Sequence, residues 1–319
     1  MNVLTVTLAL SAALANGAAS ALQRRAAMEQ VEFEGAGSRP DARQATRRLS
    51  QLVRRPFWLA GASALGLSAA FQTGALAVGS LSVVQPLMAS ELLFTLLLGT
   101  AVFHHRPDGR TWMSFLMLAV GLGLFLSAAG PSEGETTGRA GTWLAVGISA
   151  AAAMTALTLF ARILDGAARA AVLGCATAVS FACTAALIKE VTGRIPEGVA
   201  AVFATAYLYA MCCAGLLSLL LLQSTLRAGT LAASQPALTL GDALVGVLLG
   251  KALFDERIAL GARLLPTTLG VCLIVAGTVG LSLSPAVAGH WDSTRGNDNA
   301  AEQARPQPMA DNDGGTESR

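Results

Sequence analysis

Residues 79–103 read GSLSVVQPLMASELLFTLLLGTAVF, an apolar run that carries one acidic residue, Glu91, near its middle. An α-helix rises about 1.5 Å per residue, so about 20 mostly apolar residues cross the hydrocarbon core of a bilayer, which is about 30 Å thick. Lipid cannot hydrogen-bond to an open backbone, and the run lacks the alternation of a barrel strand, so we expect a helix. The stretch therefore predicts a transmembrane helix with a carboxyl group at mid-membrane.

The same pattern recurs along the chain and predicts nine transmembrane helices. Of the 319 residues, 53% are hydrophobic and 13% are charged, and the mean hydropathy is +0.56. Soluble proteins carry about 25% charged residues, so this chain has too little polar surface for water. The predicted fold class is therefore all-α, a polytopic integral membrane helical bundle that packs tightly through its many small residues. The expected spans are residues 2–22, 57–77, 79–103, 111–129, 142–161, 170–188, 198–222, 229–254 and 260–284.

The distribution of basic residues predicts the orientation of these helices. Residues 1–9 carry no basic side chain, whereas Arg24 and Arg25 follow the first apolar run, which is the reverse of a secretory signal peptide. With nine spans, one side of the membrane receives 16 of the 22 Lys and Arg residues, and the positive-inside rule puts that side in the cytoplasm. We therefore expect a multi-pass protein of the cell (plasma) membrane with its N-terminus outside and its C-terminus cytoplasmic.

Two segments on the predicted cytoplasmic side are hydrophilic. Residues 23–56 hold eight Arg and are interpreted as a linker followed by a basic surface helix that ends at Arg54 and Arg55, an anchor on anionic lipid in preference to a regulatory site. Residues 285–319 are polar and are predicted to be a disordered tail. The small net charge of +2 argues against nucleic acid as a partner. The five cysteines lie in apolar stretches and are interpreted as packing residues.

A duplicated sequence is the most informative pattern in the chain. Gln85-Pro86 recurs as Gln235-Pro236, and residues 98–106 (LGTAVFHHR) recur, after a one-residue insertion, as residues 249–257 (LGKALFDER). The third span thus resembles the eighth. Because the two lie five spans apart, an odd number, the second copy must cross the bilayer in the opposite direction to the first. Inverted repeats of this kind are typical of secondary transporters. The chain is accordingly divided into a first transmembrane half, 1–130, and a second, 131–284.

Two acidic residues, Glu91 and Asp242, are predicted to lie deep within spans, while the other eighteen fall in loops, ends or tails. They occupy equivalent positions in the two copies. An acidic residue at a span centre costs about 2.5–3.5 kcal/mol on insertion scales. We interpret both carboxylates as facing a water-filled cavity, where they exchange a proton or hold a cation. The alternative is that each is protonated and hydrogen-bonded to a neighbouring helix, or to Thr95 or Thr239 on its own face.

Other polar residues of the spans extend this candidate pathway. Gln235 lies two turns before Asp242 on the same helix face, whereas Gln85 lies about 120° from Glu91 unless the helix is disturbed. Proline can disturb a helix by removing a backbone hydrogen bond, or it can simply kink it. The predicted substrate or coupling-ion pathway therefore comprises Glu91, Asp242, Gln85, Pro86, Gln235, Pro236, Thr95, Thr239, Asn16 and Gln72.

The sequence contains no pattern that indicates catalysis. It has no nucleophile elbow, phosphate-binding loop or zinc-protease motif. His104 and His105 are interpreted as solvated loop residues in preference to a metal site. We expect neither enzymatic activity nor a cofactor, and if the chain carries a cation, Glu91 and Asp242 are the predicted ligands.

The duplicated stretches resemble the paired signatures of the drug/metabolite transporter superfamily. The resemblance rests on residues 85–103, on residues 235–257, and on the closing run GVCLIVAG at 270–277, and it is strongest to nine-span bacterial members of the EamA-like and NIPA-like branches. It implies two inverted halves that move small metabolites, amines, drugs or divalent cations by alternating access, often with a proton gradient. By position, it implies that Gln85, Pro86, Glu91, Gln235, Pro236 and Asp242 line or shape the pathway, and that Phe103, Arg106, Phe254, Glu256 and Arg257 mark helix ends.

The pattern and the resemblance together predict a secondary active transporter of small metabolites or drugs. Its expected partners are the lipid bilayer, a small-molecule or cation substrate, and protons, and no oligomeric state is predicted. One alternative is a NIPA-like Mg²⁺ transporter, because Mg²⁺ keeps several waters and needs only one or two carboxylate ligands. The alternative of another class is a non-transporting membrane scaffold or regulator, in which both acids stay protonated or paired.

Overall fold

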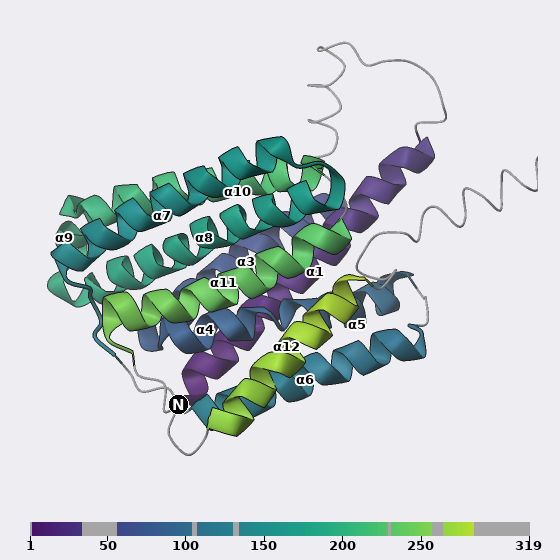
Figure 1. Ribbon diagram of the computed structural model, residues 1–319, viewed down its shortest axis with the longest axis horizontal. Helices are drawn as coiled ribbons and strands as arrows, with labels where there is room; N and C mark the ends of the chain where they lie inside the picture. Colours follow the sequence, from purple (N-terminus) through teal and green to yellow (C-terminus); the bar gives the residue numbers. More distant parts are fainter. Residues whose placement is uncertain are drawn as a thin grey trace, which may run out of the picture. The chain divides into compact units, whose positions relative to one another are not determined.

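The computed structural model describes residues 2–33, 56–103, 107–129, 134–228, 231–256 and 264–283, and every regular element in these ranges is helical (Figure 1). The α-helices are α1 (Val3–Phe33), α3 (Pro56–Val78), α4 (Leu81–Met88), α5 (Glu91–Phe103), α6 (Gly109–Ala129), α7 (Ala140–Phe160), α8 (Gly166–Gly193), α9 (Val199–Ala204), α10 (Ala206–Ala228), α11 (Leu231–Phe254) and α12 (Leu264–Ser282). Two single 3₁₀ turns, Ala161–Ile163 and Ile195–Glu197, follow α7 and α8.

Within the described residues, nine helical segments are long and apolar enough to cross a membrane, with α4 and α5 together forming the third. This confirms the predicted all-α, polytopic class. The seventh span differs from its prediction: it runs over Ala206–Ala228, not 198–222. The reason is local, because Gly198 has a positive φ of 104° and Thr205 is extended, so residues 199–204 form the separate helix α9.

The first helix is longer than predicted. Residues 23–33, expected to begin a linker, continue α1 to Phe33 because they are mostly good helix formers such as Gln, Arg, Ala and Met. The guanidinium of Arg25 lies 4.7 Å from the centre of the Phe57 ring, which fixes this extension to the start of α3. The predicted surface helix ending at Arg54 and Arg55, and the predicted tail 285–319, lie outside the described residues.

Four helix pairs carry most of the packing: α1 with α3, α8 with α10, α8 with α11, and α6 with α12 (Figure 1). Small residues permit this, as predicted. A Cβ added at Gly61 of α3 would lie 2.8 Å from Cγ of Gln23, and one at Gly121 of α6 would lie 2.9 Å from the backbone oxygen of Gly270 on α12. Gly66, by contrast, faces open space, so not every small residue of the spans marks a helix contact.

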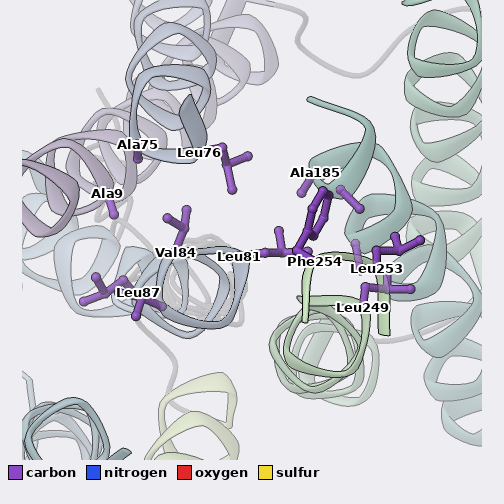
Figure 2. Close-up of a cluster of buried hydrophobic side chains, with 13 residues drawn as sticks. Ala9, Ala75, Leu76, Leu81, Val84, Leu87, Ala185, Leu249, Leu253 and Phe254 are labelled. Atoms are coloured by element: carbon purple, nitrogen blue, oxygen red, sulfur yellow. The ribbon is translucent and has the colours of Figure 1, made fainter. Parts of the chain in front are cut away.

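The main apolar core joins α1, α3, α4, α8 and α11 (Figure 2). Its largest fully buried side chain, Phe254, lies at the end of α11 among residues of α4 and α8, and Leu81 points toward it. Along α8 and α10 the contact is polar instead: the hydroxyls of Thr177 and Thr225, and those of Ser180 and Ser218, lie 2.8 Å apart in each pair. Such hydroxyl pairs hold helices together where no water competes.

Candidate functional site

The third span is broken in its middle, directly before Glu91. Helix α4 ends at Met88, and the N–H groups of Ala89 and Ser90 donate to oxygens only three residues back, at 3.1 and 3.0 Å. These tight turns separate α4 from α5, which begins at Glu91. Pro86 lies in the last turn of α4, and the break follows it at Ala89 and Ser90. In the other copy, α11 passes Pro236 without a break.

Glu91 is held by an amide from the first helix. Nδ2 of Asn16 on α1 donates to Oε2 of Glu91. The two helices touch here because Gly17 has no side chain: a Cβ at this position would lie 2.9 Å from the backbone nitrogen of Thr95 and 3.0 Å from Cβ of Phe94. Glu91 also occupies the first turn of α5, where the positive end of the helix dipole favours a negative charge.

Asp242 is held by an amide from the other copy of the repeat. Nε2 of Gln85, whose residue is 2% exposed, donates to Oδ1 of Asp242 at 3.4 Å. The two helices meet at Gly246, where an added Cβ would lie 2.7 Å from Cβ of Gln85. This region of the broken span thus holds both amide–carboxylate pairs, because Gln85 lies on α4 and Glu91 begins α5, on either side of the break.

Two buried oxygens of this region lack a hydrogen-bond donor. Among the described residues, Oε1 of Gln85 and Oγ1 of Thr239 are buried without a partner. Thr239 precedes Asp242 by three residues and so lies on the same face of α11. Neither Thr95 nor Thr239 bonds to a carboxylate, so the partners of the two acids are amides of other helices and not threonines of their own.

The structure does not join every predicted pathway residue to this group. Asn16, Gln85, Glu91 and Asp242 are connected in two amide–carboxylate pairs. Gln72 on α3 and Gln235 on α11 are half-buried and make no side-chain hydrogen bond within the described part of the chain. Their participation, like the proposed roles of Pro86 and Pro236, stays a prediction.

A second polar site, at one end of the bundle, was not predicted from the sequence. The fully buried carboxylate of Glu256, just after α11, accepts hydrogen bonds from the N–H groups of Leu81 and Ser82 at 2.7 and 2.8 Å. It also accepts from Oγ of Ser82 and from Nζ of Lys189, both at 2.5 Å. Glu256 thereby caps the N-terminus of α4 from a distant part of the sequence and neutralises a buried lysine.

The neighbouring Glu190 repeats this arrangement at the end of α8. Its buried carboxylate accepts from the N–H of Gly138 at 2.6 Å, from Nε1 of Trp143 at 3.0 Å and from Arg194 at 2.8 Å. We call Ser82, Lys189, Glu190, Arg194 and Glu256 the ionic end cluster. Beside it lies a cavity of about 220 Å³, lined by Lys189, Gly193 and residues 76–80 and 134–136.

Two acids that the sequence did not single out belong to this cluster, and both lie at helix ends, as predicted for the acids other than Glu91 and Asp242. Glu190 and Glu256 have side chains with no exposed surface. The Lys-Glu pair directly after the predicted span 170–188 was the available signal, because charges so close to an apolar run need partners. Glu256 does lie at a helix end, where the resemblance placed it as a structural marker.

Metal ligation by clustered side chains finds little support. The described residues contain no group of three or more His, Cys, Asp or Glu side chains placed to hold a metal ion. His104 and His105 lie outside the described residues. A cation at the midplane would therefore take the two carboxylates together with neutral oxygens such as Oε1 of Gln85.

The fold defines this chain as a polytopic integral membrane protein. It is similar to an uncharacterized protein of Corynebacterium glutamicum, with 28% identity over 293 residues that cover 88% of this chain and 95% of that protein. No protein-family model matches the chain, and no solved structure matches it. The similarity shows a distant relative of nearly the same length and assigns no family, so the resemblance to drug/metabolite transporters stays a prediction.

Proposed function

We propose that the protein is a secondary active transporter that moves small metabolites or drugs by alternating access, with Glu91 and Asp242 coupling this movement to protons or a cation. One observation carries the proposal: the two repeat-related carboxylates each bond to an amide of another helix, and Oε1 of Gln85 and Oγ1 of Thr239 have no donor among the described residues. A buried polar atom without a partner costs about 1–3 kcal/mol. A bound proton, an ammonium group or a cation removes that cost, so the region is suited to binding one of them.

The directions of the two copies also support the proposal. Along α4, Ser82 lies beside Gly250 and Gln85 lies beside Gly246, so residue numbers rise on one helix as they fall on the other. Helices α4 and α11 therefore run antiparallel, which supports an inverted repeat. The packing of α1 on α3 in the first half and of α8 on α10 in the second is compatible with such a repeat.

Alternating access also needs one end of the pathway to close while the other opens. The ionic end cluster provides such a closure, because it joins α4, α8 and the end of α11 through buried charged hydrogen bonds. The break at Ala89 and Ser90 provides a place where α4 can move relative to α5. Both features suit a helix that shifts at one end of the bundle.

A NIPA-like Mg²⁺ transporter is the second candidate, favoured by the oxygen atoms at the same site. Carboxylate oxygens of Asp242 lie beside Gln85 and Thr239, and Mg²⁺ prefers oxygen ligands. A non-transporting scaffold or regulator is the third, and in it the amide–carboxylate pairs serve only to join helices.

The test is transport by the purified full-length chain in liposomes that contain a pH-sensitive or a Mg²⁺-sensitive dye. Compounds are first chosen by the thermal stabilisation they give among polyamines, amino acids, nucleobases and divalent ions. We expect compound-driven proton flux in the wild type, a loss of about tenfold or more in Glu91→Gln and in Asp242→Asn, and full flux in Asp255→Asn, an exposed acid outside the region.

The possible outcomes separate the candidates. Full and equally pH-dependent flux in both carboxylate variants would remove these residues from the mechanism. Mg²⁺ entry without proton flux would favour the second candidate. If the folded wild-type protein transports no compound or ion, only the third candidate, a scaffold or regulator, would remain.

A further inference from the structure

Three arginines surround a cavity at the end of the bundle opposite the ionic end cluster. The cavity has a volume of about 410 Å³ and is lined at the ends of α7, α8 and α10. Arg162 lies in the 3₁₀ turn after α7, Arg169 in the first turn of α8, and Arg227 in the last turn of α10. Helix α8 packs between α7 and α10, so these three ends meet (Figure 1).

Among the residues that the structure describes, no carboxylate neutralises the charge of this cavity. Its lining holds three guanidinium groups and no carboxylate. Within the described ranges, none of the three arginines forms an ion pair, and the nearby Asp165 has an exposed side chain that bonds to none of them. Three like charges around one cavity repel each other, so an anion placed among them is favoured.

The hydroxyl groups of the lining are already used. Oγ1 of Thr158 donates to the backbone oxygen of Met154 at 2.8 Å, and Oγ of Ser224 donates to that of Leu220 at 3.0 Å. Recognition of an anion therefore falls to the guanidinium groups, whose forked donors match the oxygens of a phosphate.

Apart from the arginines and these two hydroxyl residues, the lining of the cavity is apolar, which distinguishes a lipid from a free anion. Leu173, Leu221 and Ala161 line it between the arginines and the middle of the spans. Outside it, Leu159, Leu220 and Leu226 are about half exposed along the same helices, where acyl chains can pack. A lipid whose headgroup carries one phosphate, followed by acyl chains, matches this sequence of charged and apolar surface. The cavity volume lies within the range of about 300–1,000 Å³ found for small-molecule sites.

We propose that this cavity, which we call the arginine cavity, binds the phosphate of an anionic phospholipid. The proposal is independent of transport. It agrees with the distribution of Lys and Arg residues, which predicts that this end of the bundle faces the cytoplasm. Basic pockets between transmembrane helices bind anionic headgroups on that side of the membrane. A topology anchor alone would require positive charges near the membrane surface but would not require them to share a cavity.

The test is native mass spectrometry of the purified full-length protein titrated with phosphatidylglycerol or with phosphatidylcholine. We expect one tightly held phosphatidylglycerol and a preference over phosphatidylcholine. Each basic residue near an anionic surface contributes about a fivefold gain in binding, so changing Arg162, Arg169 and Arg227 together to Gln is expected to weaken phosphatidylglycerol binding about 100-fold. The matched control changes Arg110, Arg139 and Lys251 to Gln, which removes the same charge from exposed sites outside the cavity.

A second variant covers the case in which the triple substitution does not fold. Leu221→Trp keeps every charge and fills the apolar part of the cavity, so it is expected to lose the same binding. Equal binding by the cavity triple and the control triple, or full binding by Leu221→Trp, would overturn the proposal. So would equal affinity for the two lipids. Displacement of phosphatidylglycerol by millimolar sodium phosphate would assign the cavity to a soluble anion and refute the lipid.

Discussion

Replacement of Glu256 by Gln is expected to destabilise the protein more than a change at any exposed acid. The wild-type carboxylate accepts four hydrogen bonds, two from backbone N–H groups, one from Oγ of Ser82 and one from Nζ of Lys189, at 2.5–2.8 Å. A glutamine has one acceptor oxygen, and its NH₂ group would face donors. The ammonium of Lys189, whose side chain is 7% exposed, would lose its counter-charge.

The magnitude follows from what is left unpaired. Removing one partner of a buried ion pair costs about 3–5 kcal/mol, because the other charge stays buried without compensation. Loss of an N-cap side chain alone costs about 0.5–2 kcal/mol. Part of this cost for α4 is already included in the energy of the broken ion pair, so the two are not added. We therefore expect Glu256→Gln to lower the free energy of unfolding by about 3–5 kcal/mol, and Lys189→Met to lower it by a similar amount.

The assay is a double-mutant cycle measured by unfolding in mixed micelles with increasing SDS. If the two residues form a pair, the double variant Lys189→Met/Glu256→Gln should cost less than the sum of the single variants by about 1–3 kcal/mol. Asp165→Asn is the control, because its side chain is exposed, Asn is equally suited to its N-cap position before α8, and surface changes cost about 0.5 kcal/mol or less. A cost below 1 kcal/mol for Glu256→Gln, or strict additivity, would refute the reasoning.

Three further predictions concern other parts of the fold. Gly17→Ala should force α1 away from α5 and cost about 1–3 kcal/mol by the same SDS assay, whereas Gly66→Ala, at an open position, should cost none; equal effects would contradict the contact. Ser218→Ala should cost about 0.6 kcal/mol through the loss of its bond to Ser180, and no change would contradict it. Before α6, the hydroxyl and N–H of Thr111 donate to Asp108 and lower its pKa from 3.8, so the stability that this carboxylate adds is present above pH 3.8 and is lost as the pH falls through the lower pKa of the folded state. The melting temperatures of the wild type and of Asp108→Asn should therefore converge in acid. A difference that stays constant with pH would contradict this.

The spans were predictable because length and hydropathy alone determine whether a helix can cross a bilayer. Helix α11, expected at 229–254, begins at Leu231 and ends at Phe254. Breaks inside apolar runs were harder to place. Thr205 lies among apolar residues, and Ala89 lies inside a run that continues as helix beyond Ser90 and Glu91, so backbone geometry is needed to place the end of α9 or α4.

The candidate site was predictable in part. Glu91, Asp242 and Asn16 could be selected because a polar group inside a span is costly and must have a partner. Which partner it has depends on helices far apart in the sequence: Asn16 and Glu91 are separated by 75 residues, and Ser82 and Glu256 by 174. No local pattern encodes such pairs, and for that reason the ionic end cluster was missed.

The short helix α4 links the two polar sites of the structure. Its N-terminus is capped by Glu256, its C-terminus ends at the break before Ser90, and Gln85 between them bonds to Asp242. Gln85 lies three residues from Ser82, about 4.5 Å along the helix axis. Loss of the negative charge of Asp242 would weaken the hydrogen bond from the Gln85 amide, because a neutral oxygen is a poorer acceptor, and α4 would then depend more on the cap. We therefore expect the carboxylate and the cap to be energetically coupled, and strict additivity of Asp242→Asn and Glu256→Gln in the SDS assay would show that they act separately.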